Sequence, residues 1–177
     1  GLRNGNFGYL LTLYHPSFTM SDFQISALPA GAFEDFFAKT DAELAQLGAR
    51  RVLADKKPGY PCRVSLSDAE PGEELLLLHY LHHDTGSPYQ ASGPVFVRKN
   101  ASTARPGVNE IPPFLLHRLL SVRGYDEGGT MVSALVCEGV ELASRLHELF
   151  ANRKIAYIHV HNAKPGCFNC AVYRAAT

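Results

Sequence analysis

Alternating apolar and polar residues predict short β-strands along most of the chain. Successive side chains of a strand point to opposite faces, so a half-buried strand alternates with a period of two. The pattern holds over residues 23–28, 62–66 and 156–161, and residues 51–54, 94–98 and 168–173 are further predicted strands. Residues 122–125 and 131–137 flank the sequence Asp-Glu-Gly-Gly-Thr, which is typical of a β-hairpin turn.

Large apolar residues at helical spacing predict a few short helices. The clearest is 140–151, where one stripe holds Leu142, Leu146, Leu149 and Phe150. Residues 32–38 and 114–120 are two further helices, and Thr40 with Glu43 forms a capping box that starts another, which Gly48 ends.

Residues 74–80 form a run that is apolar on both faces, which indicates a central strand covered on both sides. Polar residues predict a loop over 82–92, and Pro, Gly and Asn predict an irregular segment over 100–113. We therefore expect an α+β fold, a single domain over 20–177 with a mostly antiparallel, curved sheet and a few packed helices.

The bulk composition excludes several classes of protein. The 17 basic residues balance 17 acidic ones without a basic cluster, which argues against nucleic acid as a partner. No run reaches the ~20 apolar residues that span a bilayer, and four unevenly spaced cysteines do not suggest a disulfide framework. We expect a cytoplasmic protein, with residues 1–19 an extension upstream of a natural start at Met20.

The strongest candidate chemistry lies in the C-terminal stretch 157–170. Strand alternation places Tyr157, His159 and His161 on one face, with the opposite face in the core. With Cys167 and Cys170 the pattern becomes His-x-His-x5-Cys-x2-Cys, and four such donors suit zinc. In a continuous strand, however, an i, i+3 pair of cysteines points to opposite faces. His159 and His161 with one further donor is therefore an alternative metal site.

Two other interpretations of this stretch stay open. Cys167 follows Pro165-Gly166, so it is a candidate catalytic nucleophile with His161 as its base. Alternatively, the histidines lie on the solvent-exposed face of the strand and the cysteines only pack. Tyr157, His159 and Asn162 are candidate ligand-binding residues.

Two weaker candidates lie earlier in the chain. His79, His82 and His83 either line the mouth of a pocket or belong to a solvated loop. Arg98 follows the hydroxyl-rich loop 87–94, where it could hold an anion, and is a further candidate ligand-binding residue.

Three motifs of the chain resemble the bacterial family catalogued as domain of unknown function 1203. They are Tyr60-Pro-Cys-Arg-Val-Ser-Leu66, the segment from Ser87-Pro-Tyr to Ser-Gly-Pro-Val-Phe-Val-Arg98, and Tyr157-Ile-His-Val-His-Asn-Ala-Lys-Pro-Gly-Cys-Phe168. The resemblance covers about 21–174 and implies a small bacterial protein, without implying a catalytic residue. Residues 1–19 lie outside it, and the family does not require a cysteine at the position of Cys170.

We therefore expect a domain that binds a small molecule or a metal near 157–170, with zinc as the candidate cofactor. One alternative is a cysteine- or metal-dependent enzyme that uses Cys167 with His159 or His161. Another is an interaction protein that forms homo-oligomers through the apolar segment 7–14.

Overall fold

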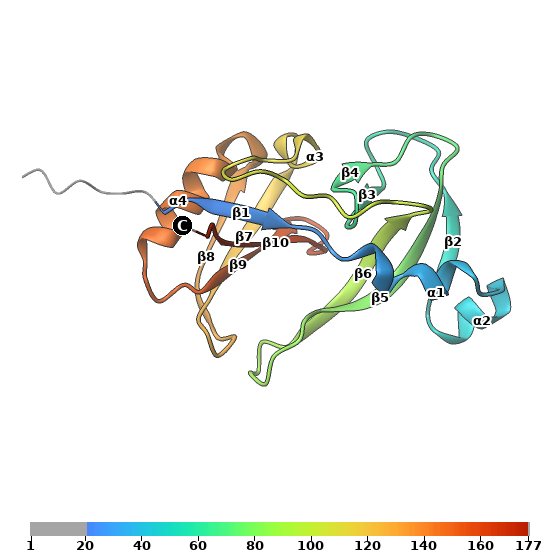
Figure 1. The fold of residues 1–177 in the computed structure, drawn as a ribbon, viewed down its shortest axis with the longest axis horizontal. Coiled ribbons are helices and arrows are strands. Elements are labelled where there is room, and N and C mark those ends of the chain that lie inside the picture. The colour runs from blue at the N-terminus through green and yellow to red at the C-terminus, as the bar shows by residue number, and fades with distance from the viewer. Residues whose placement is uncertain (1–20, 177) are drawn as a thin grey trace, which may run out of the picture.

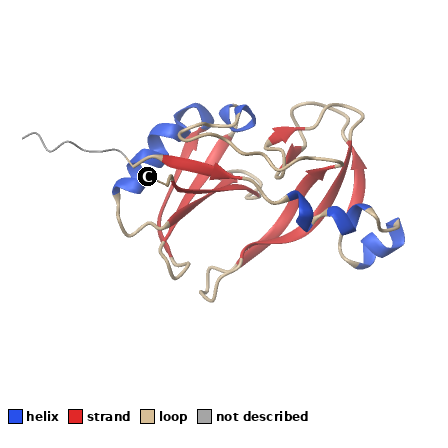
Figure 2. Ribbon diagram, viewed as in Figure 1, coloured by secondary structure: helices blue, strands red, loops and turns tan. Residues whose placement is uncertain are grey.

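The computed structural model describes residues 21–176, which form ten strands in two five-stranded sheets (Figures 1 and 2). The first sheet has the order β1-β10-β9-β7-β8, and all its pairs are antiparallel. Its strands are β1 (Phe23–Ser26), β7 (Leu119–Tyr125), β8 (Met131–Glu138), β9 (Tyr157–Asn162) and β10 (Phe168–Arg174).

The second sheet has the order β2-β5-β6-β3-β4, with one parallel contact where Cys62 of β3 pairs with Phe96 of β6. Its strands are β2 (Arg50–Leu53), β3 (Pro61–Cys62), β4 (Ser67–Asp68), β5 (Glu74–His83) and β6 (Ala91–Arg98). The predicted α+β class and the mostly antiparallel pairing are confirmed, and the strands are divided between two sheets.

The helices are short and lie beside the sheets (Figure 2). They are α1 (Glu34–Phe37), α2 (Asp41–Gln46), α3 (Pro113–Leu116) and α4 (Leu142–Ala151), with 3-10 turns η1 (Ala30–Ala32) and η2 (Gly139–Glu141). The predicted capping box is confirmed, because the Thr40 side chain accepts from the Glu43 amide while the Glu43 carboxylate accepts from the Thr40 amide.

The larger core lies between α4 and one face of the first sheet. The predicted apolar stripe of α4 is buried there, against the alternate residues Ile158 and Val160 of β9. Phe114 and Leu115 of α3 close the same core. The opposite face of β9 carries Tyr157, His159 and His161, so these residues lie on the face of the first sheet that is away from α4.

A second core covers the second sheet. Leu76 and Leu78 of β5 pack with Phe33 and Leu44, and Leu75 belongs to a smaller cluster on the other face. The apolar run in β5 is therefore covered on both sides, as predicted.

Three predicted elements were wrong in part. Residues 62–66 are not a strand, because the chain turns after Cys62 and buries the successive residues Arg63 and Val64. The helix predicted at 114–120 ends at Leu116, and β7 begins at Leu119. The loop predicted over 82–92 is shorter, because β5 continues to His83 and β6 begins at Ala91.

The tips of two hairpins, β5–β6 and β7–β8, come together at the lower edge of Figure 1. Thr85 Oγ1 donates to the Gly128 carbonyl (3.1 Å), and Ser87 Oγ donates to the Gly129 carbonyl (2.7 Å). These bonds bring the last residues of β5 over the face of the first sheet that lies away from α4. None of the helices in residues 21–176 is long and apolar enough to cross a membrane. The predicted extension 1–19 and its self-association lie outside the described residues.

Candidate metal centre

Two histidines of β9 are buried on the face of the first sheet that lies away from α4. His159 is 4% exposed and His161 is 1% exposed, so the alternative that placed them on a solvent-exposed face is wrong. Alternation along β9 points both rings in the same direction, as predicted. What covers them comes from the second sheet.

The end of β5 supplies two more histidines through a break in strand regularity. The pairing of β5 with β6 shifts register between Leu81 and His83, with His82 in the irregularity. Neighbouring strand residues normally point to opposite faces, but the rings of His82 and His83 both lie against His159, at centroid distances of 6.2 and 4.9 Å. A bulge re-aims side chains in this way. The solvated-loop interpretation of these two histidines is therefore wrong.

Three of these histidines form one compact group. His82, His159 and His161 each offer a ring nitrogen, and the three nitrogens lie within 4.8 Å of one another. In residues 21–176, His82 Nδ1, His159 Nδ1 and His161 Nε2 are buried without a hydrogen-bond partner. A buried polar atom without a partner costs about 1–3 kcal/mol, and it is uncommon in native proteins. Three such atoms on three neighbouring histidines require an explanation.

The hydrogen bond of His161 fixes which of its nitrogens is free. Its Nδ1 lies 2.9 Å from the Gly166 carbonyl oxygen, which can only accept, so Nδ1 carries the proton and Nε2 keeps its lone pair. Gly166 has φ of +79°, and this left-handed conformation aims its carbonyl back at β9. A metal-bound histidine typically donates its other N–H to such a carbonyl.

Burial keeps all three imidazoles neutral at physiological pH. Desolvation lowers the pKa of His159 to about 2, that of His161 to about 3 and that of His82 to about 4. The neighbouring histidines add to the effect on His159, because they disfavour a second positive charge. A neutral imidazole has the free lone pair that a metal ion needs.

The geometry of the group fits a tetrahedral ion after a small contraction. At Zn–N distances of about 2.0–2.1 Å, ligand nitrogens lie about 3.3 Å apart, so each would move about 1 Å from its place here. His82 is partly exposed while the other two are buried, so the side of the group that lies nearest to solvent is that of His82.

Aromatic rings enclose the group. Phe168 stacks on His82 and meets His159 edge-on, at 5.0 Å in both cases, and Tyr125 lies 5.3 Å from His159. His83 is a positioning residue: its Nδ1 lies 2.7 Å from the Tyr89 carbonyl oxygen, so its Nε2 accepts from the Tyr157 hydroxyl, also at 2.7 Å. The predicted residue Tyr157 thus touches the group through His83.

The two cysteines of the motif lie apart from the three nitrogens. Cys170 is fully buried in the core on the other face of β10, where desolvation raises the pKa of its thiol to about 12. It cannot join His159 and His161, which removes the four-ligand site. Cys167 is partly exposed, and its Sγ donates weakly to the Pro165 carbonyl (3.9 Å). Its role as a nucleophile stays a prediction.

The other predicted ligand-binding residues are also separate from the histidine group. By strand alternation Asn162 lies on the face of β9 opposite to His159 and His161. Its side-chain oxygen accepts a hydrogen bond from the Asn169 amide (2.9 Å). Arg98 lies at the far end of β6, about 23 Å along the strand from Ala91, the partner of His83. There it pairs with Glu73 (2.5 Å) and donates to Ser65 and Ser67.

The sequence did not predict that His82 joins His159 and His161 in one candidate site. It did identify the cluster that contains His82, and it required one further donor for His159 and His161. What it lacked was the bulge in β5 and the packing of β5 over β9. No local sequence signal reports either feature.

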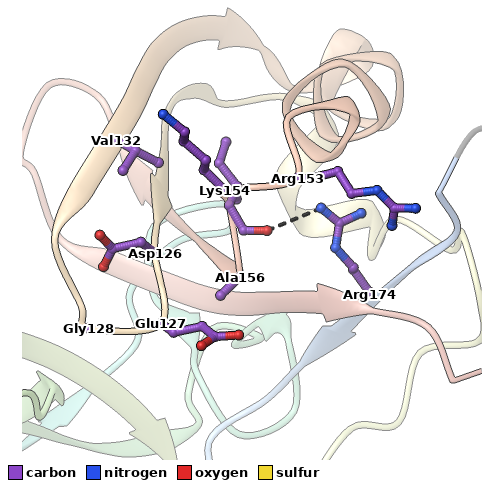
Figure 3. A pocket seen from close by; sticks show the side chains of 9 residues that line it. Asp126, Glu127, Gly128, Val132, Arg153, Lys154, Ala156 and Arg174 are labelled. Atoms are coloured by element: carbon purple, nitrogen blue, oxygen red, sulfur yellow. Dashed lines mark hydrogen bonds between the residues drawn. The ribbon is translucent and has the colours of Figure 1, made fainter.

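A separate hollow of about 580 Å³ lies on the outer side of the β7–β8 hairpin (Figure 3). Its lining is of mixed charge and includes Asp126, Glu127, Arg153, Lys154 and Arg174. Arg174 is held by the carbonyls of Ile155 and Asn152. None of the three histidines lines this hollow.

A family model described as "Protein of unknown function (DUF1203)" matches residues 59–174, a span that includes His82, His159 and His161. No curated protein and no solved structure matches the chain.

Proposed function

This chain belongs to the DUF1203 family, whose function is unknown, and we propose from its own residues that it binds one divalent transition-metal ion through His82, His159 and His161. The observation that carries the proposal is this cluster of three histidines, in which one ring nitrogen of each lies within 4.8 Å of the others and each ring has a buried nitrogen without a hydrogen-bond partner. A bound ion would give each nitrogen the partner that it lacks.

The ligand type narrows the metal. Imidazole nitrogens suit zinc, copper, iron and nickel, whereas magnesium and calcium prefer oxygen ligands. Zinc is the candidate, since a d¹⁰ ion accepts the tetrahedral geometry that three histidines and one further ligand provide.

Three protein ligands leave a coordination position open, which is the pattern of catalytic rather than structural zinc sites. The open position would lie on the partly exposed side, near His82. A small molecule or water bound there would be polarised by the metal, so a metal-dependent enzyme is the form of activity that this site favours. The residues of the chain would hold the ion, exclude bulk water and keep the imidazoles neutral.

The test is a metal titration of protein first freed of metal with a chelator. Wild-type protein should bind one equivalent of Zn²⁺ or Co²⁺. His161→Asn keeps a donor for the Gly166 carbonyl and removes Nε2, while His159→Gln and His82→Gln remove Nδ1. Each variant should lower the metal affinity by more than about 10–100-fold, which is the loss when a residue that only supports a metal ligand is changed.

The matched control is His79→Gln. His79 lies on the same strand as His82, is exposed, and bonds only the Ser92 hydroxyl (2.8 Å). It should bind metal as the wild type does. Metal affinity that is equal in His79→Gln and His161→Asn, with both proteins folded by circular dichroism, would overturn the proposal.

A further inference from the structure

An arginine lies beside the histidine group on the same face of the first sheet. Arg123 of β7 is directly opposite His159 in the β7–β9 pairing, and Ser121 is opposite His161. Residues opposite each other in an antiparallel pair project from the same face, with Cα atoms about 4.5–5.5 Å apart. The guanidinium of Arg123 therefore shares the face that carries the candidate ligands.

Arg123 is oriented but not neutralised. Its Nε donates to Ser121 Oγ (3.1 Å), which fixes the side chain across the strand. Within residues 21–176 no carboxylate lies within 4.0 Å of it, whereas four other arginines pair with carboxylates. These four are Arg51, Arg98, Arg118 and Arg145.

The charge of Arg123 acts on all three histidines. It contributes, after desolvation and the nearest neighbours, to the lowered pKa values of His82, His159 and His161. It also opposes the rise that burial causes in the pKa of Tyr125. The pairing of Arg123 with His159 and the bond to Ser121 give the position from which this charge acts.

The charges of the occupied site would not balance. Three neutral imidazoles, a divalent ion and one guanidinium add up to a strongly positive site, and the ligand group contains no Asp or Glu. The three histidines also form no ion pair with a carboxylate in the part of the chain that the structure describes. Uncompensated charge in a partly buried site is costly, so an anion is the complementary partner.

We infer, building on the proposed metal centre, that its open position takes the oxyanion group of a small molecule, a carboxylate or a phosphate. One oxygen of this group coordinates the metal, and the guanidinium of Arg123 holds its charge. The planar guanidinium matches carboxylate and phosphate oxygens with paired N–H donors, a geometry that lysine lacks. Ser121 is a positioning residue, because it holds Arg123 through Nε and not through the terminal nitrogens.

The experiment uses the Co²⁺-loaded full chain, whose visible absorption reports a change of ligand at the metal. Titration with acetate and, separately, with inorganic phosphate should shift the spectrum with saturation. Acetamide, which has the shape of acetate without its charge, should not. The anion that saturates at the lower concentration identifies the group that the site prefers.

Arg123→Gln should weaken the anion response at least 10-fold while Co²⁺ still binds at one equivalent. Arg123→Lys should retain only part of the anion response, because lysine keeps the positive charge but lacks the paired N–H donors of the guanidinium. Arg105→Gln removes the same charge from an exposed loop residue and should behave as wild type.

The two proposals fail separately. If Co²⁺ does not bind to the wild type, the metal centre and the anion site are both overturned. If Co²⁺ binds but acetate and phosphate leave its spectrum unchanged, the anion inference alone is wrong. An equal response in Arg123→Gln and wild type also overturns the inference.

Discussion

The ring of His82 stacks on the ring of Phe168, with centroids 5.0 Å apart and planes 5° from parallel. His82 belongs to β5 of the second sheet, and Phe168 belongs to β10 of the first. Phe168 is paired with His161 and also meets His159 edge-on. One phenylalanine therefore packs against the candidate ligand that comes from the other sheet, and contacts both candidate ligands of its own sheet.

Replacing Phe168 should affect both stability and metal affinity. Phe168 is 2% exposed, and truncation of a buried phenylalanine to alanine typically costs about 3–5 kcal/mol. Phe168→Ala should lose stability in this range and should also weaken Zn²⁺ binding, because His82 loses the surface that orients it. Phe168→Leu keeps apolar volume and should lose less of both.

The control for this change is Phe114→Ala, at a residue that is 4% exposed in the core on the α4 side of the first sheet. It should cost comparable stability in urea unfolding while metal affinity in the folded protein stays unchanged. If both variants weaken Zn²⁺ binding equally, the stacking contact has no specific role at the site.

The metal-free protein should lose stability as the pH falls from 7 to 5. Burial lowers the pKa of His159 to about 2 and that of His161 to about 3, whereas both titrate near 6.5 in the unfolded chain. Below pH 6.5 the unfolded state takes up protons that the folded state refuses, so unfolding becomes more favourable down to the folded pKa. Between pH 7 and 5, each histidine contributes at most about 2 kcal/mol of this loss.

Urea unfolding in the presence of a chelator at pH 7 and pH 5 measures this loss. His161→Asn lacks one of the three imidazoles whose pKa is lowered and should show a smaller difference between the two pH values than the wild type. The matched control is His79→Gln, which should keep the full difference. Equal pH dependence in all three proteins would show that the buried imidazoles do not govern it.

The local periodicity of the sequence was enough to predict about half of the site. A period of two in β9 predicted that His159 and His161 share a face and that the opposite face, with Ile158 and Val160, is core. Whether the histidine face is wet or buried depends on the second sheet. The packing of two sheets is a tertiary contact that no strand encodes alone.

The missing half depends on irregular backbone. Polar residues from His82 onward predicted a loop, because a strand end that buries histidines has the same polarity as a solvated turn. Residues 62–66 alternate like a strand, yet the buried Arg63 lies in a turn and donates from Nε to the Phe168 carbonyl (2.7 Å). Arg123 lay in a correctly predicted hairpin, but only the register of β7 against β9 brings it to the histidines.

If Cys167 is a catalytic nucleophile, its thiol should react rapidly with an alkylating reagent, and the rate should depend on a histidine. Cys167 is partly exposed, while Cys62, Cys137 and Cys170 are buried at 0%, 4% and 0% exposure. Iodoacetamide at pH 7 should therefore modify Cys167 first in the folded protein, as peptide mapping would show. If His161 serves as its base, His161→Asn should slow this modification. An identical rate in both proteins would leave Cys167 an accessible thiol without catalytic activation.

Substituting Gly166 should strain the turn and loosen His161 together. The residue has φ of +79°, and a Cβ built there meets no atom within 4 Å, so the cost of Gly166→Ala comes from the backbone. An L-residue other than glycine pays about 1–2 kcal/mol in the left-handed region, and stability should fall by about that amount. Its carbonyl accepts from His161 Nδ1, so a shift of the turn should also weaken Zn²⁺ binding, by about 10-fold.

Gly31→Ala is the matched control, because its added Cβ also meets nothing within 4 Å and its φ lies outside the left-handed region. It should leave the stability and the Zn²⁺ affinity close to those of the wild type. Urea unfolding and Zn²⁺ titration of the two variants separate backbone strain from the general effect of a methyl group. If Gly166→Ala loses stability but binds Zn²⁺ as tightly as the wild type, the Gly166 carbonyl supports the turn and not the ligand. The metal centre would then rest on the three histidines and on Phe168, without a carbonyl that fixes the tautomer of His161.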